Sequence, residues 1–177
     1  FRLSIFGESH GSGVGITLDG VPPGIAMNTN DFTEDLLRRK PGAKGTTPRI
    51  EKDAPSFLSG VFNGFTTGAP LTVYFENSNT RSKDYSKLKT HFRPGHADFT
   101  AERKYSGFQD FRGGGHFSGR LTLCLVAAGV VSKKILGETV AVHASLIEAG
   151  GQSDIDAAYK ENVAGYIVKP LDKANFD

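Results

Sequence analysis

The sequence predicts an α+β fold, a layered sandwich in which antiparallel β-sheets enclose buried helices. Its 22 glycines are dispersed along 177 residues, which indicates many tight turns between short strands. Several short apolar segments alternate with polar positions, as strands with one buried face do. One longer run, from Arg120 to Leu136, is apolar on nearly every side and predicts a helix buried between layers. Strands on both sides of a buried helix give the sandwich.

The strands are predicted from alternation and from the turn residues that bound them. Asn63-Gly64 and Thr66-Thr67-Gly68 supply turn chemistry between the two central segments. The predicted strands are Leu3 to Phe6, Val14 to Leu18, Phe57 to Phe62, Leu71 to Phe75 and Val140 to Ile147.

Two further helices are expected beside the long apolar one. Asp31 followed by Glu34 is typical of a helix start, Phe32, Leu36 and Leu37 supply an apolar face, and Pro41-Gly42 ends the helix. A polar, superficial helix is expected from Asp154 to Glu161.

The composition fits one globular domain and excludes several classes of site. The formal net charge of +2 is too small to indicate a nucleic-acid partner by itself. Cys124 is the one cysteine, which excludes an internal disulfide and a multi-cysteine zinc site, and no metal site is predicted. No apolar run reaches the roughly 18 residues that span a membrane, and no signal peptide is indicated. We therefore expect a cytoplasmic protein with no membrane partner.

Both ends of the chain lie within segments that show no clear start or end of a helix or strand. Phe1 begins within an alternating segment and is not an initiator methionine, and Asp177 closes a similar stretch. We expect residues 1–177 to be a single domain from the N-terminal part of a longer chain.

The first chemical motif places His10 in the sequence Gly7-Glu8-Ser9-His10-Gly11. An imidazole, with a reference pKa of roughly 6.5, can donate a proton near neutral pH. The flanking glycines let the backbone bend around it, and the Ser9 hydroxyl can bind an anionic oxygen. For this motif alone, a histidine in a surface turn is the more frequent explanation.

The second motif contains His96 in Arg93-Pro94-Gly95-His96-Ala97-Asp98. Arg93 can help to hold an anion, and the carboxylate of Asp98 can orient an imidazole. A static ion pair is the alternative explanation.

A third group of residues is cationic. Arg38-Arg39-Lys40 ends the predicted helix, and Lys44 and Arg49 follow it. Such a cluster is usually a solvated surface that the helix dipole favours. A substrate with several negative charges would require cations of this kind.

The glycine run Gly113–Gly115 differs from known nucleotide motifs. No Gly-Lys-Ser/Thr follows at the P-loop position, and a dinucleotide fingerprint is absent. The run leads to Ser118 and Arg120 at the start of the long helix, where free amides and the dipole can hold negative charge. A loose glycine turn is the alternative.

Together these motifs resemble the chorismate synthase family. The resemblance extends over the stretch from His10 through Val14 to Gly24, over Arg81 to Tyr85 and His91 to Thr100, and over the glycine motif. It covers roughly the first half of the family's chain. It implies a sandwich of helices between antiparallel sheets, assembly as a homotetramer, and a lyase that uses reduced FMN.

The resemblance also implies roles for individual residues. His10 would protonate the departing phosphate of 5-enolpyruvylshikimate 3-phosphate, and His96 would help to protonate reduced flavin. The implied substrate-binding residues are Ser9, Arg39, Arg93, Ser118 and Arg120. The implied cofactor-binding residues are Arg39, Lys44, His116, Phe117 and Ser118.

The chain departs from the family pattern at several of these positions. The family commonly has arginine and a small residue at the positions of His116 and Phe117, and alanine at Gly119. Arg38-Arg39-Lys40 departs from three arginines, and lysine presents a point charge where arginine presents a planar fork.

Two questions stay open from the sequence. The flavin can be reduced by NADPH on the protein itself or by an external reductant. The alternative to a lyase is a noncatalytic half-protein that binds flavin or another anion.

An RNA-binding domain is disfavoured by the balanced charge. His91 and His143 lie in no motif, so they are expected to be exposed or core-satisfied histidines. The apolar surroundings of Cys124 predict a core residue.

Overall fold

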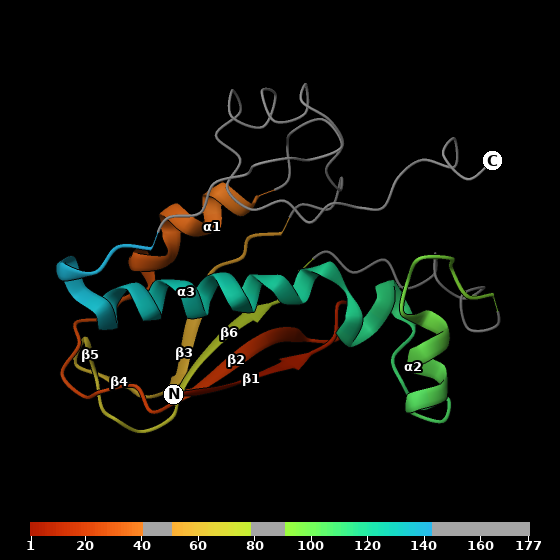
Figure 1. The fold of residues 1–177 in the computed structure, drawn as a ribbon, viewed down its shortest axis with the longest axis horizontal. Helices are drawn as coiled ribbons and strands as arrows, with labels where there is room; N and C mark the ends of the chain where they lie inside the picture. The colour runs from red at the N-terminus through yellow and green to blue at the C-terminus, as the bar shows by residue number, and fades with distance from the viewer. Residues whose placement is uncertain (41–50, 79–90, 143–177) are drawn as a thin grey trace.

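A four-stranded antiparallel sheet with a long helix on one face forms the framework of the structure. The computed structural model describes residues 1–40, 51–78 and 91–142 (Figure 1). The sheet has the order β1-β2-β6-β3, formed by Arg2–Gly7, Gly13–Asp19, Leu71–Glu76 and Pro55–Ser59. β4 (Val61–Phe62) and β5 (Phe65–Thr66) form a separate two-stranded hairpin. This mixture of helices and antiparallel strands confirms the α+β class.

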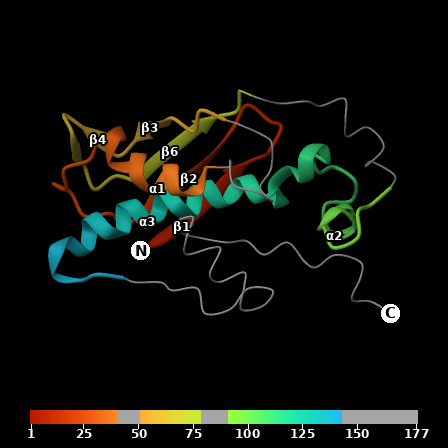
Figure 2. The same cartoon turned by 90° about the horizontal axis from the view of Figure 1, so that it is seen from above.

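The helices lie in layers above the sheet. α3 (Thr122–Leu136) runs across one face of the sheet, and α1 (Thr33–Arg39) packs on the other side of α3 (Figure 1). α2 (Asp98–Lys104) stands beyond the beginning of α3, as the view from above also shows (Figure 2). The 3₁₀ segments are Thr29–Phe32, Arg112–Phe117, Gly119–Leu121 and Gly137–Thr139.

The core forms between the sheet and α3. Alternate residues of β2 and β6 point toward the helix, because side chains alternate between the two faces of a strand. The buried core side chains from these three elements include Val14, Ile16, Leu18, Leu71, Val73, Phe75, Leu123, Cys124, Ala127, Val130 and Val131. The predicted buried helix is therefore confirmed, although one of its apolar side chains, Leu125, is 51% exposed.

The opposite face of the sheet is shaped by two glycines of β2. A Cβ atom on Gly15 would lie 2.3 Å from Cζ of Phe6, and one on Gly13 would lie 2.3 Å from the hydroxyl oxygen of Tyr74. The rings of Phe6 and Tyr74 therefore lie against bare backbone of β2. Aromatic side chains that cover strand glycines in this way help to set the strand register.

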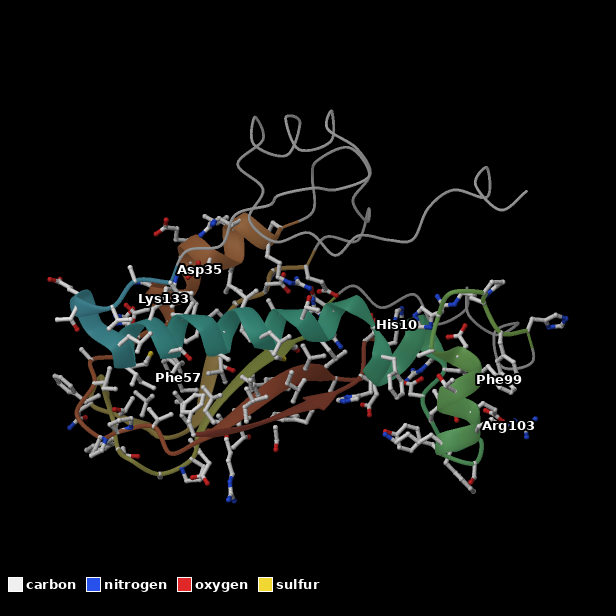
Figure 3. All side chains as sticks on the ribbon, in the orientation of Figure 1. His10, Asp35, Phe57, Phe99, Arg103 and Lys133 are labelled. Atoms are coloured by element: carbon white, nitrogen blue, oxygen red, sulfur yellow. The ribbon has the colours of Figure 1, made fainter. Side chains whose placement is uncertain are left out.

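α1 and the 3₁₀ turn before it are each joined to α3 by an ion pair. Lys133 donates a hydrogen bond to Asp35, and Lys134 Nζ lies 2.8 Å from Asp31 Oδ2. Figure 3 shows Asp35 and Lys133 facing each other across the two helices. Phe32 packs on Phe57 of β3, with ring centroids 5.9 Å apart, so the same segment also reaches the sheet.

The predicted strands at the beginning of the chain and at Leu71 to Phe75 are confirmed, whereas Phe57 to Phe62 is wrong as a single strand. The chain leaves the sheet at Gly60, which has φ +85°, and a Cβ atom there would lie 2.5 Å from Leu71 Cα. The close approach to Leu71 therefore requires glycine and divides the segment. The predicted Asn63-Gly64 turn is confirmed, with φ of 49° and 79°, as a two-residue hairpin requires.

The helix predicted from Asp31 is α1, which begins at Thr33 after the 3₁₀ turn Thr29–Phe32, so Asp31 with Glu34 does not form its start. The capping box joins Asn28 to Asp31, because Asn30 N donates to Asn28 Oδ1 at 2.8 Å and Asn28 N donates to Asp31 Oδ2 at 2.7 Å. Leu37 is 55% exposed and is not part of the apolar face.

Two predictions near the end of the chain are only partly covered. Val140–Val142 form no strand, and the rest of the predicted strand to Ile147 lies outside the described residues. The predicted helix from Asp154 to Glu161 also lies outside them.

Candidate active site

His10 lies in a tight turn that joins β1 to β2. Gly11 N donates to the carbonyl of Glu8 at 3.1 Å, so Ser9 and His10 occupy the two central positions of a β-turn. Both side chains are buried, with 2% and 7% of their surface exposed. Ser9 Oγ lies 3.2 Å from His10 Nδ1, which holds the imidazole in place.

His96 belongs to a compact group with Arg93 and Asp98 at the start of α2. Asp98 Oδ1 lies 2.7 Å from His96 Nδ1. Arg93 donates to both carboxylate oxygens of Asp98, each at 2.8 Å. The hydrogen bond from Arg93 is the largest cause that lowers the pKa of Asp98 to about 2, against the opposing effect of burial. An ionised Asp98 favours the tautomer of His96 with a proton on Nδ1. The other ring nitrogen, Nε2, then points away from Asp98 and can interact with other partners.

The glycine loop brings the two histidines together. A Cβ atom on Gly113 would lie 2.3 Å from both Cε1 and Nδ1 of His10. A Cβ atom on Gly114 would lie 2.6 Å from Cε1 and 2.8 Å from Nε2 of His96. Because consecutive Cα atoms are about 3.8 Å apart, the rings lie against neighbouring points of one backbone. The two histidines that the sequence predicts separately therefore pack on the same loop.

The loop is held to the His10 turn and tolerates no ordinary side chains. Ser9 N donates to the carbonyl of Gly115 at 3.1 Å. Gly113, Gly114 and Gly115 all have positive φ, of 58°, 87° and 54°. These angles favour glycine, and the histidine rings fill the space where Cβ atoms would stand.

Arg112 and Asp110 form a bidentate pair beside the glycine loop. Arg112 Nε donates to Asp110 Oδ1 at 2.8 Å, and Nη2 donates to Oδ2 at 2.7 Å. The hydrogen bond from Arg112 is the main cause that lowers the pKa of Asp110, and His10 lowers it further. A negative charge therefore stands near His10 and favours the imidazolium form.

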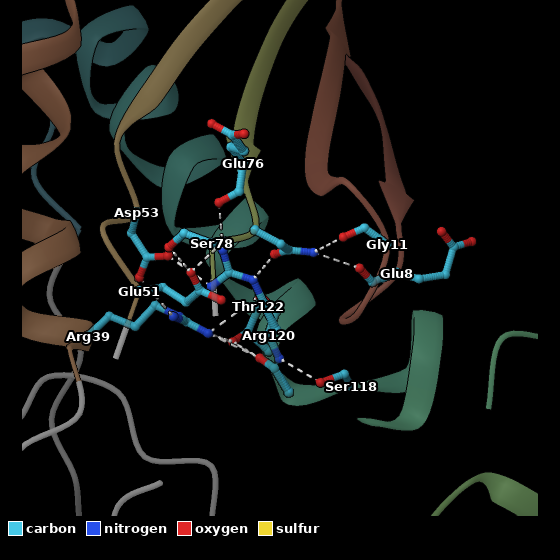
Figure 4. A network of polar contacts seen from close by, with 12 residues as sticks. Glu8, Gly11, Arg39, Glu51, Asp53, Glu76, Ser78, Ser118, Arg120 and Thr122 are labelled. Carbon is cyan, nitrogen blue, oxygen red and sulfur yellow. Dashed lines mark hydrogen bonds and ion pairs between the residues drawn. The ribbon is translucent and has the colours of Figure 1, made fainter. Parts of the chain in front are cut away.

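Arg39 reaches from the end of α1 to the beginning of α3. Its Nη2 donates to the carbonyl of Gly119 and to Thr122 Oγ1, both at 3.1 Å, and its Nη1 lies 3.9 Å from Asp53 Oδ2 (Figure 4). Burial lowers the pKa of Arg39, while Asp53 acts in the opposite direction. The residue is thus anchored at the place where Ser118 also lies.

Arg120 is 9% exposed and is committed to internal partners. Nη1 donates to Asp53 Oδ1 at 2.8 Å, Nε donates to Asn77 Oδ1 at 2.5 Å, and Nη2 lies 3.5 Å from the carbonyl of Glu76. Figure 4 shows Arg120 enclosed by this network. The geometry favours a role in building the site over direct contact with a substrate.

A cavity of about 510 Å³ borders the glycine loop at Gly114. His116 and Phe117 line it, and His116 Nδ1 lies 3.0 Å from the carbonyl of Gly7. The ring of Phe117 lies 6.0 Å from that of Tyr105. Further aromatic side chains line the cavity: Phe6, Phe92, Phe108 and Phe111. Such a volume and such walls suit a flat organic ring.

Comparisons with known proteins agree on one family. The family model described as chorismate synthase matches residues 1–175. A chorismate synthase of Chitinophaga pinensis is 58% identical over 173 residues, which are 94% of this chain and 52% of that protein. The chain belongs to the chorismate synthase family.

Other relatives of the chorismate synthase family extend the agreement. A chorismate synthase of Pyrococcus abyssi is 52% identical over 76% of this chain and 38% of its own length. A crystal structure of a chorismate synthase has a TM-score of 0.53 and 31% identity, and covers 76% of this chain and 34% of that chain. The chain spans about half of the length of the first of these relatives.

The structure places most of the residues that the resemblance to chorismate synthases indicated. His10, Ser9, Arg93 and His96 gather at the glycine loop, whereas Arg39, Ser118 and Arg120 gather at the beginning of α3. Lys44 lies outside the described residues. Ser118 accepts a hydrogen bond from Arg120 N at 3.3 Å and caps the segment that follows.

Asp53, Asn77 and Asp110 are residues of this site that the motifs did not indicate. Each stands outside the quoted motifs. Asp53 and Asn77 make contacts with distant parts of the chain, whereas Asp110 pairs with Arg112, two residues further along. Asp53 has one local peculiarity, a φ of 50°, which is visible only in the structure.

Within residues 1–40, 51–78 and 91–142, no three histidine, cysteine or carboxylate side chains gather as metal ligands would. None of the helices in these ranges has the length and apolar character needed to cross a bilayer.

Proposed function

We propose that the full natural chain is a chorismate synthase, which converts 5-enolpyruvylshikimate 3-phosphate to chorismate and phosphate by anti 1,4-elimination. The observation that carries the proposal is the placement of His10 and His96 on the adjacent glycines Gly113 and Gly114. Two proton carriers at one backbone segment suit a reaction in which a phosphate leaves and protons must be managed.

His10 is proposed to donate a proton to the departing phosphate. Its imidazole is buried and held by Ser9, and the Asp110 carboxylate nearby favours the protonated form. Protonation of the leaving oxygen reduces the charge that develops as the carbon–oxygen bond breaks. The Ser9 hydroxyl is proposed to bind a phosphate oxygen in the same step.

His96 is proposed to hold a proton at Nε2, on the side of the flavin. Its Nδ1 faces Asp98, so the ring is oriented by a carboxylate that Arg93 keeps ionised. His96 is thereby oriented to exchange a proton at Nε2.

The anionic groups of the substrate require cationic and hydrogen-bonding partners. The residues proposed to bind these anionic groups are the cations Arg39 and Arg93 and the hydroxyl of Ser118. Arg39 is oriented by carbonyl groups at the beginning of α3. Preorganised charges of this kind stabilise a developing negative charge without reorganisation during the reaction. Arg120 is proposed to act by holding Arg39 and Ser118 in place rather than by contact.

The aromatic side chains of the cavity fit the ring of a flavin, whereas its carboxylates, Glu8, Asp98 and Asp110, do not suit the flavin phosphate. The cavity of about 510 Å³ lies within the usual range of roughly 300–1,000 Å³ for cofactor sites, and its aromatic walls suit an isoalloxazine ring. His116, Phe117 and Ser118 are proposed to hold FMN, with Arg39 and Lys44 at the charged end. When bound, reduced FMN would supply an electron-rich ring beside the substrate.

Three further properties are proposed from the resemblance to the family. They are a homotetrameric assembly, a cytoplasmic location, and NADPH as a source of electrons for the flavin where the protein reduces it itself. No nucleic-acid or membrane partner is proposed.

The proposal is tested by an anaerobic assay of the full natural chain with reduced FMN and 5-enolpyruvylshikimate 3-phosphate. Equal release of chorismate and phosphate is expected. Binding of FMN by a folded chain without release of either product would favour the noncatalytic flavin-binding alternative.

A further inference from the structure

The carboxamide of Asn77 lies between the His10 turn and the beginning of α3. Asn77 follows the last residue of β6, and its backbone N donates to the carbonyl of Ser12 at 3.0 Å. Its side chain therefore starts from a strand that is fixed in the sheet. From there it reaches two segments that carry chemistry.

The side chain of Asn77 binds both ends of the His10 turn. Its Nδ2 donates to the carbonyl of Glu8 at 3.0 Å and to the carbonyl of Gly11 at 2.9 Å. These two carbonyls belong to the first and last residues of the β-turn whose central residues are Ser9 and His10. One amide group thus binds both ends of the turn. The imidazole of His10, in the middle of this turn, lies against Gly113.

The remaining polar atom of Asn77 connects the turn to Arg120. Asn77 Oδ1 accepts a hydrogen bond from Arg120 Nε at 2.5 Å, and Arg120 is held in turn by Asp53. Carbonyl partners require a donor and a guanidinium requires an acceptor, so the two ends of the carboxamide are assigned by their partners. Asparagine satisfies all three contacts, whereas aspartate of the same shape would place an oxygen against two carbonyls.

We propose that Asn77 is a positioning residue that fixes His10 in its proton-donating orientation relative to Arg39 and Ser118. The inference rests on the proposed chorismate synthase activity. Asn77 acts through the turn backbone, because its amide donates to the carbonyls of Glu8 and Gly11. Small displacements of a reacting group reduce rates strongly: about 1 Å can cost roughly 100-fold. The loss is expected to be larger in kcat than in KM, because proton donation by His10 occurs in the transition state, whereas Ser9 is the only residue of the turn that is proposed to bind substrate.

The variant Asn77→Asp separates the two connections. It keeps an acceptor for Arg120 and removes both donors to the turn, without a change of size. In the full natural chain, we expect kcat to fall about 10- to 100-fold, with a smaller change in KM. The basic limb of the pH profile of kcat is expected to shift, because His10 must be protonated to act as a donor and the surroundings of its imidazole change. Asn77→Ala is expected to behave similarly.

Asn28→Ala is the matched control. Asn28 also makes side-chain hydrogen bonds to backbone, but it caps the segment before α1 on the exposed surface. Its removal is expected to lower the thermal midpoint while kcat and the pH profile stay as in wild type. A role of Asn77 in stability alone would give Asn77→Asp the same behaviour as Asn28→Ala, and that result would overturn the inference.

A second readout separates this inference from the proposed function. The NMR titration of the His10 imidazole, assigned with His10→Gln, is expected to shift in folded Asn77→Asp and to stay unchanged in Asn28→Ala. An inactive wild-type protein would contradict the proposed function, whereas this titration would still report on Asn77. Wild-type kcat, pH profile and His10 titration in Asn77→Asp would overturn the inference.

Discussion

The imidazole of His10 lies directly against the backbone of Gly113, where a Cβ atom would stand 2.3 Å from the ring. His96 has the same relationship to the next residue, Gly114, with a closest distance of 2.6 Å. The glycine loop is therefore a surface against which both rings pack. This explains two of the loop's glycines by contact with the histidines, and an anion-binding role of the loop stays a prediction.

We expect Gly113→Ala and Gly114→Ala to disturb one histidine each. Both residues have positive φ, and the added methyl group would overlap His10 or His96. The strain and displacement should cost about 1–3 kcal/mol of unfolding free energy and reduce kcat at least about tenfold. Denaturant unfolding and turnover of the full natural chain would measure both effects.

Gly129→Ala is the control for these substitutions. Gly129 lies within α3, and a Cβ atom there would meet no atom within 4 Å. Alanine is favoured over glycine inside a helix by roughly 0.5–1 kcal/mol, so this variant should be slightly more stable and fully active. Equal activity of Gly113→Ala and Gly129→Ala would contradict the proposed packing of His10 on the loop.

Arg120→Met is expected to destabilise the protein strongly, because it leaves Asp53 buried without its closest cation. The Arg120–Asp53 contact measures 2.8 Å, and both side chains are less than a tenth exposed. Removal of one partner of a buried ion pair costs about 3–5 kcal/mol. The double variant Arg120→Met/Asp53→Asn should recover part of this loss, which denaturant unfolding would measure.

Arg38→Ala provides the surface comparison. Arg38 lies 3.6 Å from Asp35, and its side chain is half exposed. Exposed ion pairs contribute about 1 kcal/mol or less, so this variant should remain close to wild type in stability. A similar cost for Arg38→Ala and Arg120→Met would show that the buried network has no special importance.

Asp98 should make stability depend on pH in the acid range. Its folded-state pKa of about 2 lies below the ordinary value of 3.8, so the ionised form stabilises the fold above pH 3.8. The contribution is lost as the pH falls toward 2. After allowance for the partly exposed Arg93, it amounts to about 1–2 kcal/mol. Unfolding of Asp98→Asn should lack this part of the pH dependence; an unchanged dependence between pH 4 and 2 would contradict the assignment.

The elements with regular apolar patterns could be predicted from the sequence. The alternation of Val14, Ile16 and Leu18 and the continuous apolar run of α3 each follow from the face that is buried. The division of Phe57 to Phe62 could not be predicted, because it depends on the approach of Gly60 to Leu71, a contact across the sheet. Local propensity carries no information about that approach.

The candidate site was predictable in its histidines and less so in its arginines. Motif spacing identified His10 and His96, but only the structure shows that one glycine loop contacts both. Arg120 was expected to bind substrate, whereas its partners Asp53 and Asn77 come from distant strand ends and enclose its guanidinium. Such partners become neighbours through the sheet topology, so their roles could not be predicted from short motifs.

The most direct test of the central claim is the turnover of His10→Gln and His96→Gln in the full natural chain, assayed anaerobically with reduced FMN. Glutamine keeps hydrogen-bonding capacity and cannot exchange a proton near neutral pH. Each variant should fold normally and lose about 100- to 10,000-fold in kcat, as the removal of an acid–base group does. Wild-type release of chorismate and phosphate by either folded variant would contradict the account.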